Sequence, residues 1–472
     1  MTRPGGRPVG RSPRRPSQRP TDRPRPKLDG ARLTAYDVLD AVSSRSAYAN
    51  LLLPQLLRER TDLEPRDAAF ATQLAYGTLR AQGTLDAVLA TLVDRGLPAL
   101  DSRVLDLLRL GAYQLMDLRV PSHAAVSTTV DLTRAIVGIG PSALVNAVLR
   151  KVAATGDRTA WLARLDASGD RALALATDHP QWILRAWRDA LGADVPGAGA
   201  ELEAALLADD AAPEVHLVAR RTSREALVAE SGGTPGPWSP HAVRLGGGDP
   251  GRLASVRSGA AAVQDEGSQL AALLLTRAPL SGRDESWLDL CAGPGGKAGL
   301  LAAVRPDGVR LTAADRSEHR AELVRSALRG EDDVEVLVAD GREGPWAPGS
   351  FDRVLLDAPC TGLGALRRRP EVRWRRQPED VVPLAQLQGE LLAAALAAVR
   401  PGGVVAYVTC SPHTAETVDV VAVAAARDDV EVLPVAPLLP HVPDSAHGDF
   451  GQLWPHRHGT DAMFMALLRR RA

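Results

Sequence analysis

The sequence predicts an α/β Rossmann-like protein, with a doubly wound, mostly parallel sheet preceded by an all-α domain and a small α+β subdomain. The C-terminal part alternates short apolar runs with helical segments, which is typical of a parallel sheet covered by helices on both faces. The N-terminal part has helical periodicity almost throughout. A length of 472 residues is enough for two to four domains, so all three parts fit in one chain.

The composition excludes several other classes of protein. Apolar residues make up 45% of the chain and charged residues 24%, which is ordinary for a globular protein. No run of 18 apolar residues occurs, so we expect no membrane-spanning helix, and the N-terminus has no apolar secretory signal. Three cysteines cannot form a disulfide framework and one must stay unpaired, which favours a reducing, cytoplasmic compartment.

Charge is distributed unevenly along the chain. The formal net charge is −1, but nine basic residues and one aspartate give residues 1–27 a charge of +8, which leaves −9 for the rest. Residues 1–31 are rich in Pro, Arg, Gly and Ser, and we expect a disordered basic tail there. A solvated tail without a partner and a nonspecific RNA tether are about equally well supported. Only three of the 56 basic residues are lysines, a bias typical of GC-rich genomes, so abundant arginine alone is weak evidence for nucleic-acid binding.

Residues 32–155 form the predicted all-α domain. Apolar residues recur there at positions i, i+3, i+4 and i+7, as in Leu85, Val88, Leu89 and Leu92, and again in Val145, Val148, Leu149 and Val152. We interpret residues 156–265 as a helical connector followed by the small α+β subdomain. Short alternating segments at 215–219 and 242–245 supply the strands of this subdomain.

Residues 266–472 form the predicted α/β domain. Its apolar runs lie at 286–290, 309–314, 334–339, 354–356 and 404–408, with helical segments that include 318–328 and 384–399. Ligands of doubly wound sheets bind beyond the carboxyl ends of the strands, so the residues at those ends are the candidates for a functional site.

The first predicted strand leads into a glycine-rich loop, Asp-Leu-Cys-Ala-Gly-Pro-Gly-Gly-Lys at 289–297. Glycines in such a loop allow a tight turn and a close approach of a ligand to the backbone. A phosphate-binding loop would need glycine in place of Cys291 and serine or threonine in place of Ala298. We therefore do not expect a nucleoside triphosphatase.

Three carboxylates close the next predicted strands: Asp315, Asp340 and Asp357. The first is placed to accept hydrogen bonds from ribose hydroxyls, and the second can meet the exocyclic amine of an adenine. Any one of them could instead cap the following helix, but that explanation is weaker for three successive strands. A glycine loop without phosphate-binding features, combined with these acceptors, suits S-adenosylmethionine.

Two cysteines close the fourth and fifth predicted strands, Cys360 in Asp-Ala-Pro-Cys and Cys410 in Thr-Cys-Ser. Buried structural cysteines and a disulfide are the alternatives. If the two strands are neighbours, both thiols lie beside the methyl donor.

A thiolate that adds to carbon 6 of cytosine makes carbon 5 nucleophilic; a base must then remove the carbon 5 proton. Asp357 is the candidate for accepting the charge that develops near N3. Amine-directed methyltransferases usually have Asn/Asp-Pro-Pro-aromatic here, so carbon is the favoured acceptor.

These motifs resemble the RNA 5-methylcytosine methyltransferases of the Sun/Fmu (RsmB) family. The resemblance rests on the segments 289–297, 357–364, 367–374, 409–411 and 456–461, and on 263–269 leading into the sheet. Segments 66–80, 108–134 and 145–151 resemble the NusB-like RNA-binding domain of the bacterial members. The likeness extends from about residue 32 to the end. Asp-Ala-Met-Phe at 461–464 replaces the family's Asp-Gly-Phe-Phe, a change that we expect to affect packing more than chemistry.

The resemblance implies a seven-stranded sheet, a set of site residues and no metal. Asp315 is implied to hold the ribose, Asp340 the adenine, and Asp357 the boundary between cofactor and base. Cys410 is implied to be the nucleophile and Cys360 to assist breakdown of the covalent adduct, whereas DNA cytosine methyltransferases use the Pro-Cys cysteine as nucleophile. The loop implied to wrap the methionine part consists of Cys291, Ala292, Gly293, Pro294, Gly295, Gly296 and Lys297. Lys297 is also a catalytic candidate that polarises the base or orients the acidic group; a structural pairing with Asp289 or Asp357 is equally compatible.

The implied substrate is a cytosine of 16S ribosomal RNA, with no membrane and no obligate protein partner. An arginine-rich run beside the Pro-Cys loop is the predicted RNA contact, with a merely solvated face as the alternative. It consists of Arg367, Arg368, Arg369, Arg373, Trp374, Arg375 and Arg376.

A second functional hypothesis is a non-catalytic NusB-like RNA-binding or antitermination protein, against which the intact cofactor and thiol motifs argue.

Overall fold

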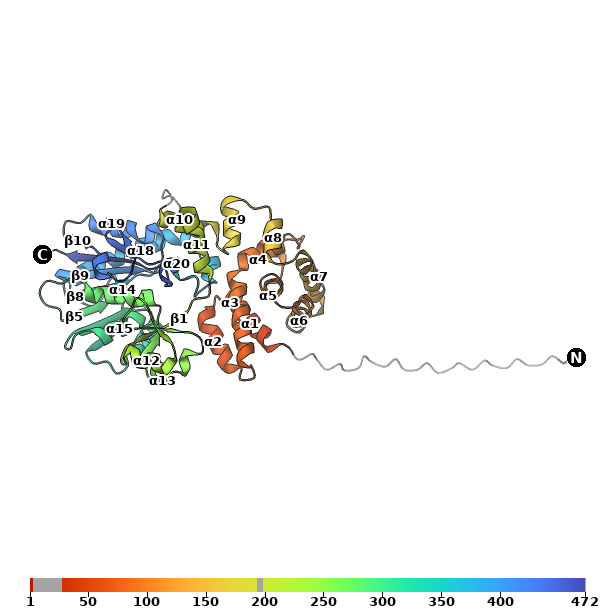
Figure 1. The fold of residues 1–472 in the computed structure, drawn as a ribbon, viewed down its shortest axis with the longest axis horizontal. Helices are drawn as coiled ribbons and strands as arrows, with labels where there is room; N and C mark the ends of the chain where they lie inside the picture. Colours follow the sequence, from red (N-terminus) through yellow and green to blue (C-terminus); the bar gives the residue numbers. More distant parts are fainter. Residues whose placement is uncertain (3–27, 193–197, 472) are drawn as a thin grey trace.

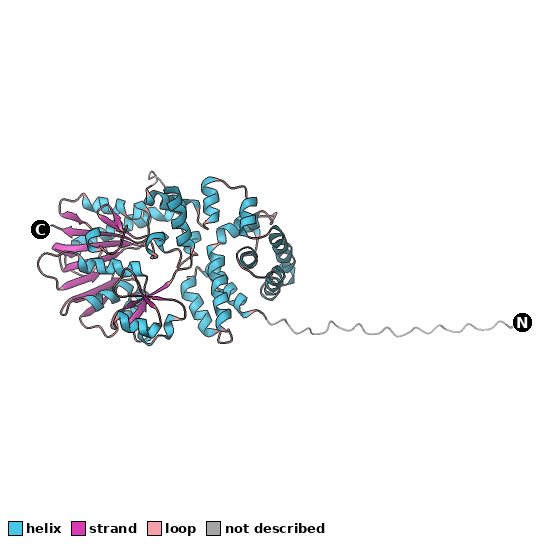
Figure 2. Ribbon diagram, in the orientation of Figure 1, coloured by secondary structure: helices cyan, strands magenta, loops and turns pink. Residues whose placement is uncertain are grey.

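The computed structural model describes residues 1–2, 28–192 and 198–471, and it consists of a helical half and a sheet-containing half (Figure 1). Most of the tail that we expect to be disordered, residues 3–27, lies outside the described residues. The strands gather at the end of the molecule that holds the C-terminus, and the opposite end is entirely helical (Figure 2).

The helical half confirms the predicted all-α domain. The residues that share helical spacing in the sequence, including Leu85, Val88, Val145 and Leu149, come together in one buried cluster. Seven helices build this half: α1 (Gly30–Arg45), α2 (Ala49–Glu59), α3 (Pro65–Arg80), α4 (Gln82–Ala90), α5 (Ser102–Met116), α6 (Ser122–Ile136) and α7 (Ile139–Thr155).

A connector and a small antiparallel sheet follow. The connector helices are α8 (Arg158–Arg164), α9 (Gly169–Ala176), α10 (Gln181–Leu191) and α11 (Ala198–Asp210). The sheet has the strand order β2-β3-β1-β4, and Leu217, Leu227 and Val243 form its small core. Its elements are β1 (Val215–Ala219), α12 (Arg224–Ser231), β2 (Thr234–Pro235), β3 (Ala242–Leu245), α13 (Ala254–Arg257) and β4 (Ala261–Val263).

The large sheet is mixed: five parallel strands in the order β7-β6-β5-β8-β9 are followed by β13, which pairs antiparallel with β9. Its strands are β5 (Ser286–Asp289), β6 (Arg310–Asp315), β7 (Val334–Val338), β8 (Phe351–Asp357), β9 (Val399–Thr409), β10 (Val430–Leu433), β11 (Ala446–His447), β12 (Phe450–Gln452) and β13 (Phe464–Arg470). Strands β10 and β12 both pair with β13. The described sheet therefore has nine strands and not seven, because the short β11 and β12 extend it.

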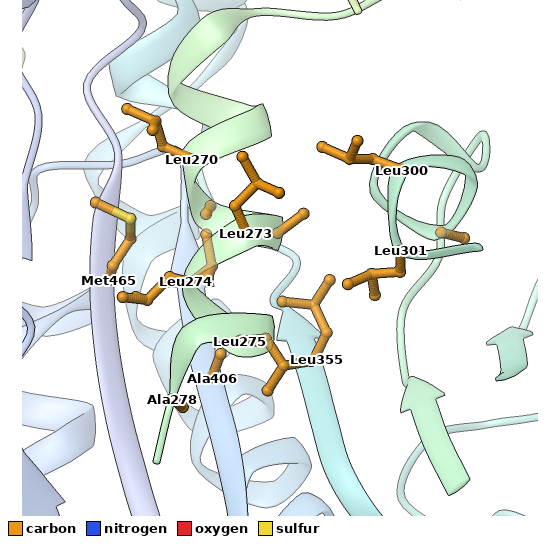
Figure 3. Packing of buried hydrophobic residues seen from close by; sticks show 14 of the residues in the cluster. Leu270, Leu273, Leu274, Leu275, Ala278, Leu300, Leu301, Leu355, Ala406 and Met465 are labelled. Carbon is orange, nitrogen blue, oxygen red and sulfur yellow. The ribbon is translucent and has the colours of Figure 1, made fainter. Parts of the chain in front are cut away.

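Alternating side chains on the central strands explain why helices cover both faces. On β9, Ala406 packs into one core and Tyr407 into the other; on β8, Leu355 and Leu356 divide in the same way. The first core is filled by α14 (Glu266–Arg277) and α15 (Gly296–Val304), and Figure 3 shows leucines of α14 packed between the sheet and α15. The second core is covered by α18 (Val381–Ala398) and α19 (Val418–Ala425).

One helix in the described part of the chain, Pro378–Ala398, is long and apolar enough to cross a membrane, which the sequence did not lead us to expect. This segment includes α18. Its residues Leu391, Leu392 and Leu396 are buried in the second core against β8 and β9, where they hold the sheet. The core helix of a soluble domain passes the same test of length and hydropathy, so the finding is weak evidence for a membrane span.

The short helix α17 (Val372–Arg375) joins the two halves of the molecule. The Arg373 side chain is fully buried; its Nη1 donates to Asp210 Oδ1 at 2.6 Å and to the Asp178 carbonyl at 2.8 Å. Trp374 Nε1 donates to the Leu79 carbonyl of α3 at 2.7 Å. Its ring approaches Gly83 so closely that a Cβ atom there would lie 2.2 Å from the indole. The helical half is therefore fixed directly beside the carboxyl ends of the large sheet.

Candidate active site

The carboxyl ends of β5, β6, β7, β8 and β9 open into one cavity of about 480 Å³. About half of the sequence-predicted site residues line it, although they are spread over 120 positions of the chain. These residues are Cys291, Gly293, Asp315, Asp340, Asp357, Cys360, Arg369, Arg375, Arg376 and Cys410.

The glycine-rich loop turns sharply between β5 and α15. Gly295 has φ +86°, and a Cβ atom there would lie 2.7 Å from Ala327 Cβ, so both the backbone and the packing require glycine. The Gly293 N–H donates to Asp315 Oδ2 at 3.1 Å, which joins the loop to the end of β6. Only Cys291 and Gly293 of the predicted loop residues line the cavity; Ala292, Pro294, Gly295, Gly296 and Lys297 shape the turn behind it.

The predicted cofactor carboxylates lie side by side on this rim. Asp315 Oδ1 accepts from the Ser317 N–H at 2.8 Å and pairs with Arg320 Nε at 3.1 Å. Asp340 forms an ion pair with Arg342, whose Nη2 lies 2.8 Å from Oδ2 of Asp340. The hydrogen bonds from Arg342 lower the pKa of Asp340 to about 2. The Asp340 carboxylate is therefore ionised at neutral pH and can accept hydrogen bonds.

These residues fit an adenosyl group without phosphates. Carboxylate acceptors stand at two adjacent strand ends, where ribose hydroxyls and an adenine amine need them. The apolar wall formed by Leu290, Ala339 and Leu391 suits a purine ring. The donor set of a phosphate loop is absent from the described segment 289–298, where Cys291 and Ala298 replace its glycine and hydroxyl residue.

Lys297 lies behind the cavity and forms a close ion pair with Asp357, which lines it, with Nζ 2.7 Å from Oδ2. Burial alone would lower the pKa of Lys297, but the Asp357 carboxylate more than offsets it, so the pKa lies above its ordinary value. Of the partners left open by the sequence, Lys297 therefore pairs with Asp357 and not with Asp289.

Asp289 is fully buried, and no hydrogen bond within the described residues reaches either of its carboxylate oxygens. Burial, reinforced by the negative charge of Asp357, raises the pKa of Asp289 to about 8. The side chain is therefore a neutral acid in the folded protein at pH 7, next to the ion pair of Asp357 and Lys297.

We expect Asp289 to make stability depend on pH. Its folded-state pKa lies above its ordinary value, so between these values the folded protein holds a proton that the unfolded chain has lost. Stability then falls as pH rises towards 8, with a slope of up to about 1.4 kcal/mol per pH unit. Asp289→Asn should flatten this slope in urea unfolding measured between pH 5.5 and 8. The exposed control Asp428→Asn should keep the slope of the parent protein, and equal slopes for all three proteins would contradict the assignment.

The two predicted thiols are brought together. Strands β8 and β9 pair in parallel, with Asp357 opposite Val408, so the loops that follow them emerge side by side. The sulfur atoms of Cys360 and Cys410 lie 3.5 Å apart, and both side chains are half-buried at the cavity.

The surroundings of the thiols differ in a way that favours ionisation of Cys410. Hydrogen bonding from the Cys360 thiol lowers the pKa of Cys410, and the positive charges of Arg369 and Lys297 act in the same direction. The same sulfur contact raises the pKa of Cys360 well above its ordinary value. Burial raises the pKa of Cys291. Of the three cysteines, Cys410 is thus the one prepared to act as a thiolate.

A buried carboxylate that sequence reasoning missed ties the two thiol loops together. Glu416 is fully buried and accepts from the Thr361 N–H at 2.8 Å, from the Ser411 hydroxyl at 2.6 Å and from the Thr361 hydroxyl. Gln388 of α18 donates to it at 3.1 Å and to the Pro359 carbonyl at 2.8 Å. No motif marks Glu416 in the sequence, since a glutamate just before an apolar helix is usually a solvated residue of the first turn.

Replacing Glu416 with glutamine is expected to reduce the catalytic rate about 10- to 100-fold. The amide keeps the size of the carboxylate but has one accepting oxygen, so at least one donor in the Cys360 and Cys410 loops is left buried without a partner, at about 1–3 kcal/mol. Because the residue acts by positioning the thiols, cofactor affinity should be unchanged and the pH–rate profile should shift. Glu379→Gln, an exposed substitution of the same type, should leave the rate and the profile unchanged. Parallel losses of rate and cofactor affinity would indicate general disruption instead.

The predicted RNA-contacting run needs correction. Arg367 and Arg373 are buried: Arg367 Nε donates to Asp461 Oδ1 at 2.7 Å, and Arg373 binds the connector. Arg368 Nη2 donates to Asp265 Oδ1 at 2.6 Å. These guanidinium groups join distant segments of the chain, since their carboxylate partners are remote in sequence, and Trp374 packs on the helical half. Arg369, Arg375 and Arg376 of this run line the cavity and remain candidates for contact with RNA.

Comparison with known proteins gives independent matches to both halves. A family model described as 16S rRNA methyltransferase RsmB/F matches residues 278–469, and a NusB family model matches residues 29–154. A Mycobacterium tuberculosis protein whose name describes it as a methyltransferase is 55% identical over 455 residues, covering 94% of this chain and 98% of its own length. Ribosomal RNA small subunit methyltransferase B of Pseudomonas syringae pv. tomato is 35% identical over 452 residues, covering 93% of this chain and 96% of the relative.

Two solved structures share the fold. PH0851 superimposes with a TM-score of 0.77 at 21% identity, over 93% of this chain and 99% of that one. NSun6 from Pyrococcus horikoshii, solved with SFG, superimposes with a TM-score of 0.54 at 18% identity, over 62% of this chain and 98% of that one. At these identities the likeness concerns the fold alone.

Proposed function

Because the chain belongs to the RsmB/F family of 16S rRNA methyltransferases and carries an N-terminal NusB domain, we propose that it methylates carbon 5 of a specific cytosine in 16S ribosomal RNA. The observation that carries this proposal is the pair of thiols 3.5 Å apart at the ends of β8 and β9, in the cavity that fits the cofactor. Methylation of a nitrogen or a ribose oxygen needs no thiol nucleophile, whereas methylation at carbon 5 does.

The proposed reaction begins with Cys410. Its thiolate adds to carbon 6 of the cytosine, and the electrons of the 5,6 double bond make carbon 5 nucleophilic. The ion pair of Lys297 and Asp357 holds a proton on Lys297 Nζ beside the cavity, which compensates the negative charge that develops in the ring towards N3. S-adenosylmethionine supplies the methyl group that carbon 5 accepts.

Release of the product requires loss of the proton on carbon 5. We assign this step to Cys360, because its sulfur lies 3.5 Å from the sulfur of Cys410. Once Cys410 is bound to carbon 6, the Cys360 thiol releases its own proton to solvent, and the resulting thiolate takes the proton from carbon 5. As the proton leaves carbon 5, the 5,6 double bond forms again, the bond between carbon 6 and Cys410 breaks, and Cys410 departs as a thiolate. The thiol of Cys360 then donates a hydrogen bond to this thiolate once more, which restores the starting state.

The cavity also defines the form of the substrate. The target base must reach Cys410 at the carboxyl ends of the strands, which a stacked and paired base cannot do, so the cytosine leaves its stack. A loop or splayed strand of the ribosomal RNA is the expected substrate. We place this reaction in the cytoplasm, where ribosomal RNA is modified in bacteria, and we assign it no obligate protein partner.

The direct test is methyl transfer to 16S RNA transcribed in vitro and therefore unmodified. Incubation with S-adenosylmethionine labelled in its methyl group should produce labelled 5-methylcytosine in the nucleoside digest, at one position that bisulfite sequencing maps. Label in N4-methylcytosine or in a ribose methyl group would overturn the proposed chemistry. Failure to bind S-adenosylmethionine at millimolar concentration would favour a non-catalytic RNA-binding protein.

A further inference from the structure

The helical half contributes one side chain to the catalytic cavity, Tyr48. Five tyrosines occur in the chain, all within the described residues, and Tyr48 alone is classed as exposed, with 44% of its surface accessible. An exposed aromatic ring at the mouth of a site can offer an apolar face to a ligand.

Helix α17 fixes the turn that carries Tyr48. Arg375 Nη2 donates to the Ala47 carbonyl at 2.9 Å, and Glu371 Oε1 accepts from the Ala49 N–H at 3.3 Å. The backbone on both sides of Tyr48 is thereby attached to the catalytic half. The guanidinium of Arg375 also lies over the tyrosine ring, 5.0 Å from its centroid. The ring is thus held in place before a ligand arrives, which lowers the entropy cost of binding.

Positive charge surrounds the ring along the cavity. Arg369 is exposed, and among the described residues no hydrogen bond or ion pair engages its guanidinium. Arg376 lines the same cavity and donates through Nε to the Thr361 carbonyl at 3.3 Å, next to Cys360. An aromatic ring beside cationic side chains suits a single strand of nucleic acid, with a base on the ring and phosphates on the cations.

We propose that Tyr48 is a stacking platform for the nucleobase next to the target cytosine, so that the NusB domain binds the substrate strand inside the catalytic cavity. The inference rests on the proposed function for the identity of the target base. The target itself must lie between Cys410 and Asp357, at the strand ends. The neighbouring nucleotide then reaches the mouth, where Tyr48 and Arg375 form the platform and Arg369 can contact the phosphate between the two nucleotides.

The first test measures binding of a fluorescein-labelled single-stranded oligocytidine RNA of ten nucleotides by fluorescence anisotropy. Tyr48→Ala should weaken binding about 10-fold, as expected for the loss of one base–aromatic stack. Tyr48→Phe keeps the ring and should bind as the parent protein does. Leu51→Ala removes another exposed apolar side chain three residues further along, outside the cavity, and should have no effect. Equal affinity for S-adenosylmethionine in all variants shows that the fold and the cofactor site are intact.

The second test locates the stacked base. Once the methylated cytosine has been mapped, an abasic nucleotide is placed beside it in a 16S RNA fragment. The abasic substitution and Tyr48→Ala should each raise KM, and the two together should raise it no further than either one alone.

Three results would overturn the platform: unchanged binding by Tyr48→Ala, equal weakening by Tyr48→Ala and Leu51→Ala, or equal weakening by Tyr48→Ala and Tyr48→Phe. If the parent protein forms 5-methylcytosine but Tyr48→Ala is neutral, this inference alone fails. If the parent protein forms none but Tyr48→Ala still loses oligocytidine binding, the proposed reaction fails and the platform stands.

Discussion

Replacing Cys410 with serine is expected to lower methyl transfer to 16S RNA by roughly four orders of magnitude, the size of effect seen when an enzyme loses its nucleophile. The substitution exchanges one atom, so the contact with Cys360 and the backbone of the loop after β9 are kept. A serine hydroxyl does not ionise near neutral pH. The positive charges of Arg369 and Lys297, which lower the pKa of Cys410, cannot compensate for this difference. Labelled 5-methylcytosine per enzyme, measured over hours, is the readout.

The parent protein should show the corresponding pH dependence. A nucleophilic thiol is active when deprotonated, so kcat/KM should rise with pH, reach half of its maximum at the pKa of Cys410 in the free enzyme, and level off above it. Because hydrogen bonding from Cys360 lowers this pKa, the midpoint should lie below that of an ordinary cysteine. Cys360→Ala removes the donor and should move the ionisation of Cys410 to higher pH, as monitored by alkylation with iodoacetamide. Turnover that survives in Cys410→Ser, with unchanged pH dependence, would contradict the assignment.

The sheet and the positions of the carboxylates at its rim could be predicted because each depends on residues close together in the sequence. Asp315 directly ends the apolar run of β6, and Asp357 that of β8, so their places at the carboxyl edge follow from the strand positions alone. The meeting of Cys360 and Cys410 required one further step, that β8 and β9 are neighbours, and the pairing confirms it. The two-residue strand β11 was not predictable, since so short a segment has no periodicity.

The errors and omissions arise where the partner is far away in the sequence. Arg373 looked like part of an exposed basic run, but its carboxylate partner Asp210 lies 163 positions earlier and draws it into the junction between the two halves. Tyr48 is placed at the cavity by Glu371, whose contact with Ala49 spans 322 positions. Local composition describes a residue's own chemistry, but whether a charge faces solvent or a buried carboxylate is decided by tertiary packing.

The Cys360→Ser variant is expected to stop after the first half of the reaction. Cys410 keeps its nucleophilic role, so the bond between its sulfur and carbon 6 of the cytosine still forms. A serine hydroxyl at residue 360 is a much weaker participant in proton transfer than a thiol, because its pKa is far higher, so the carbon 5 proton is removed slowly. We therefore expect turnover to fall about 100-fold or more, while a covalent complex of protein and RNA accumulates towards one RNA per active site.

This complex should withstand denaturing gel electrophoresis, because a carbon–sulfur bond and not the fold holds it together. The double variant Cys360→Ser/Cys410→Ser supplies the matched control and should form no complex, since it lacks the attacking thiol. If the complex accumulates instead in Cys410→Ser alone, Cys360 is the nucleophile and the two roles are reversed. The 3.5 Å contact places either sulfur next to the other. The hydrogen bond from Cys360 lowers the pKa of Cys410, and the positive charges of Arg369 and Lys297 act in the same direction. The single variants thus test whether this electrostatic difference selects the nucleophile.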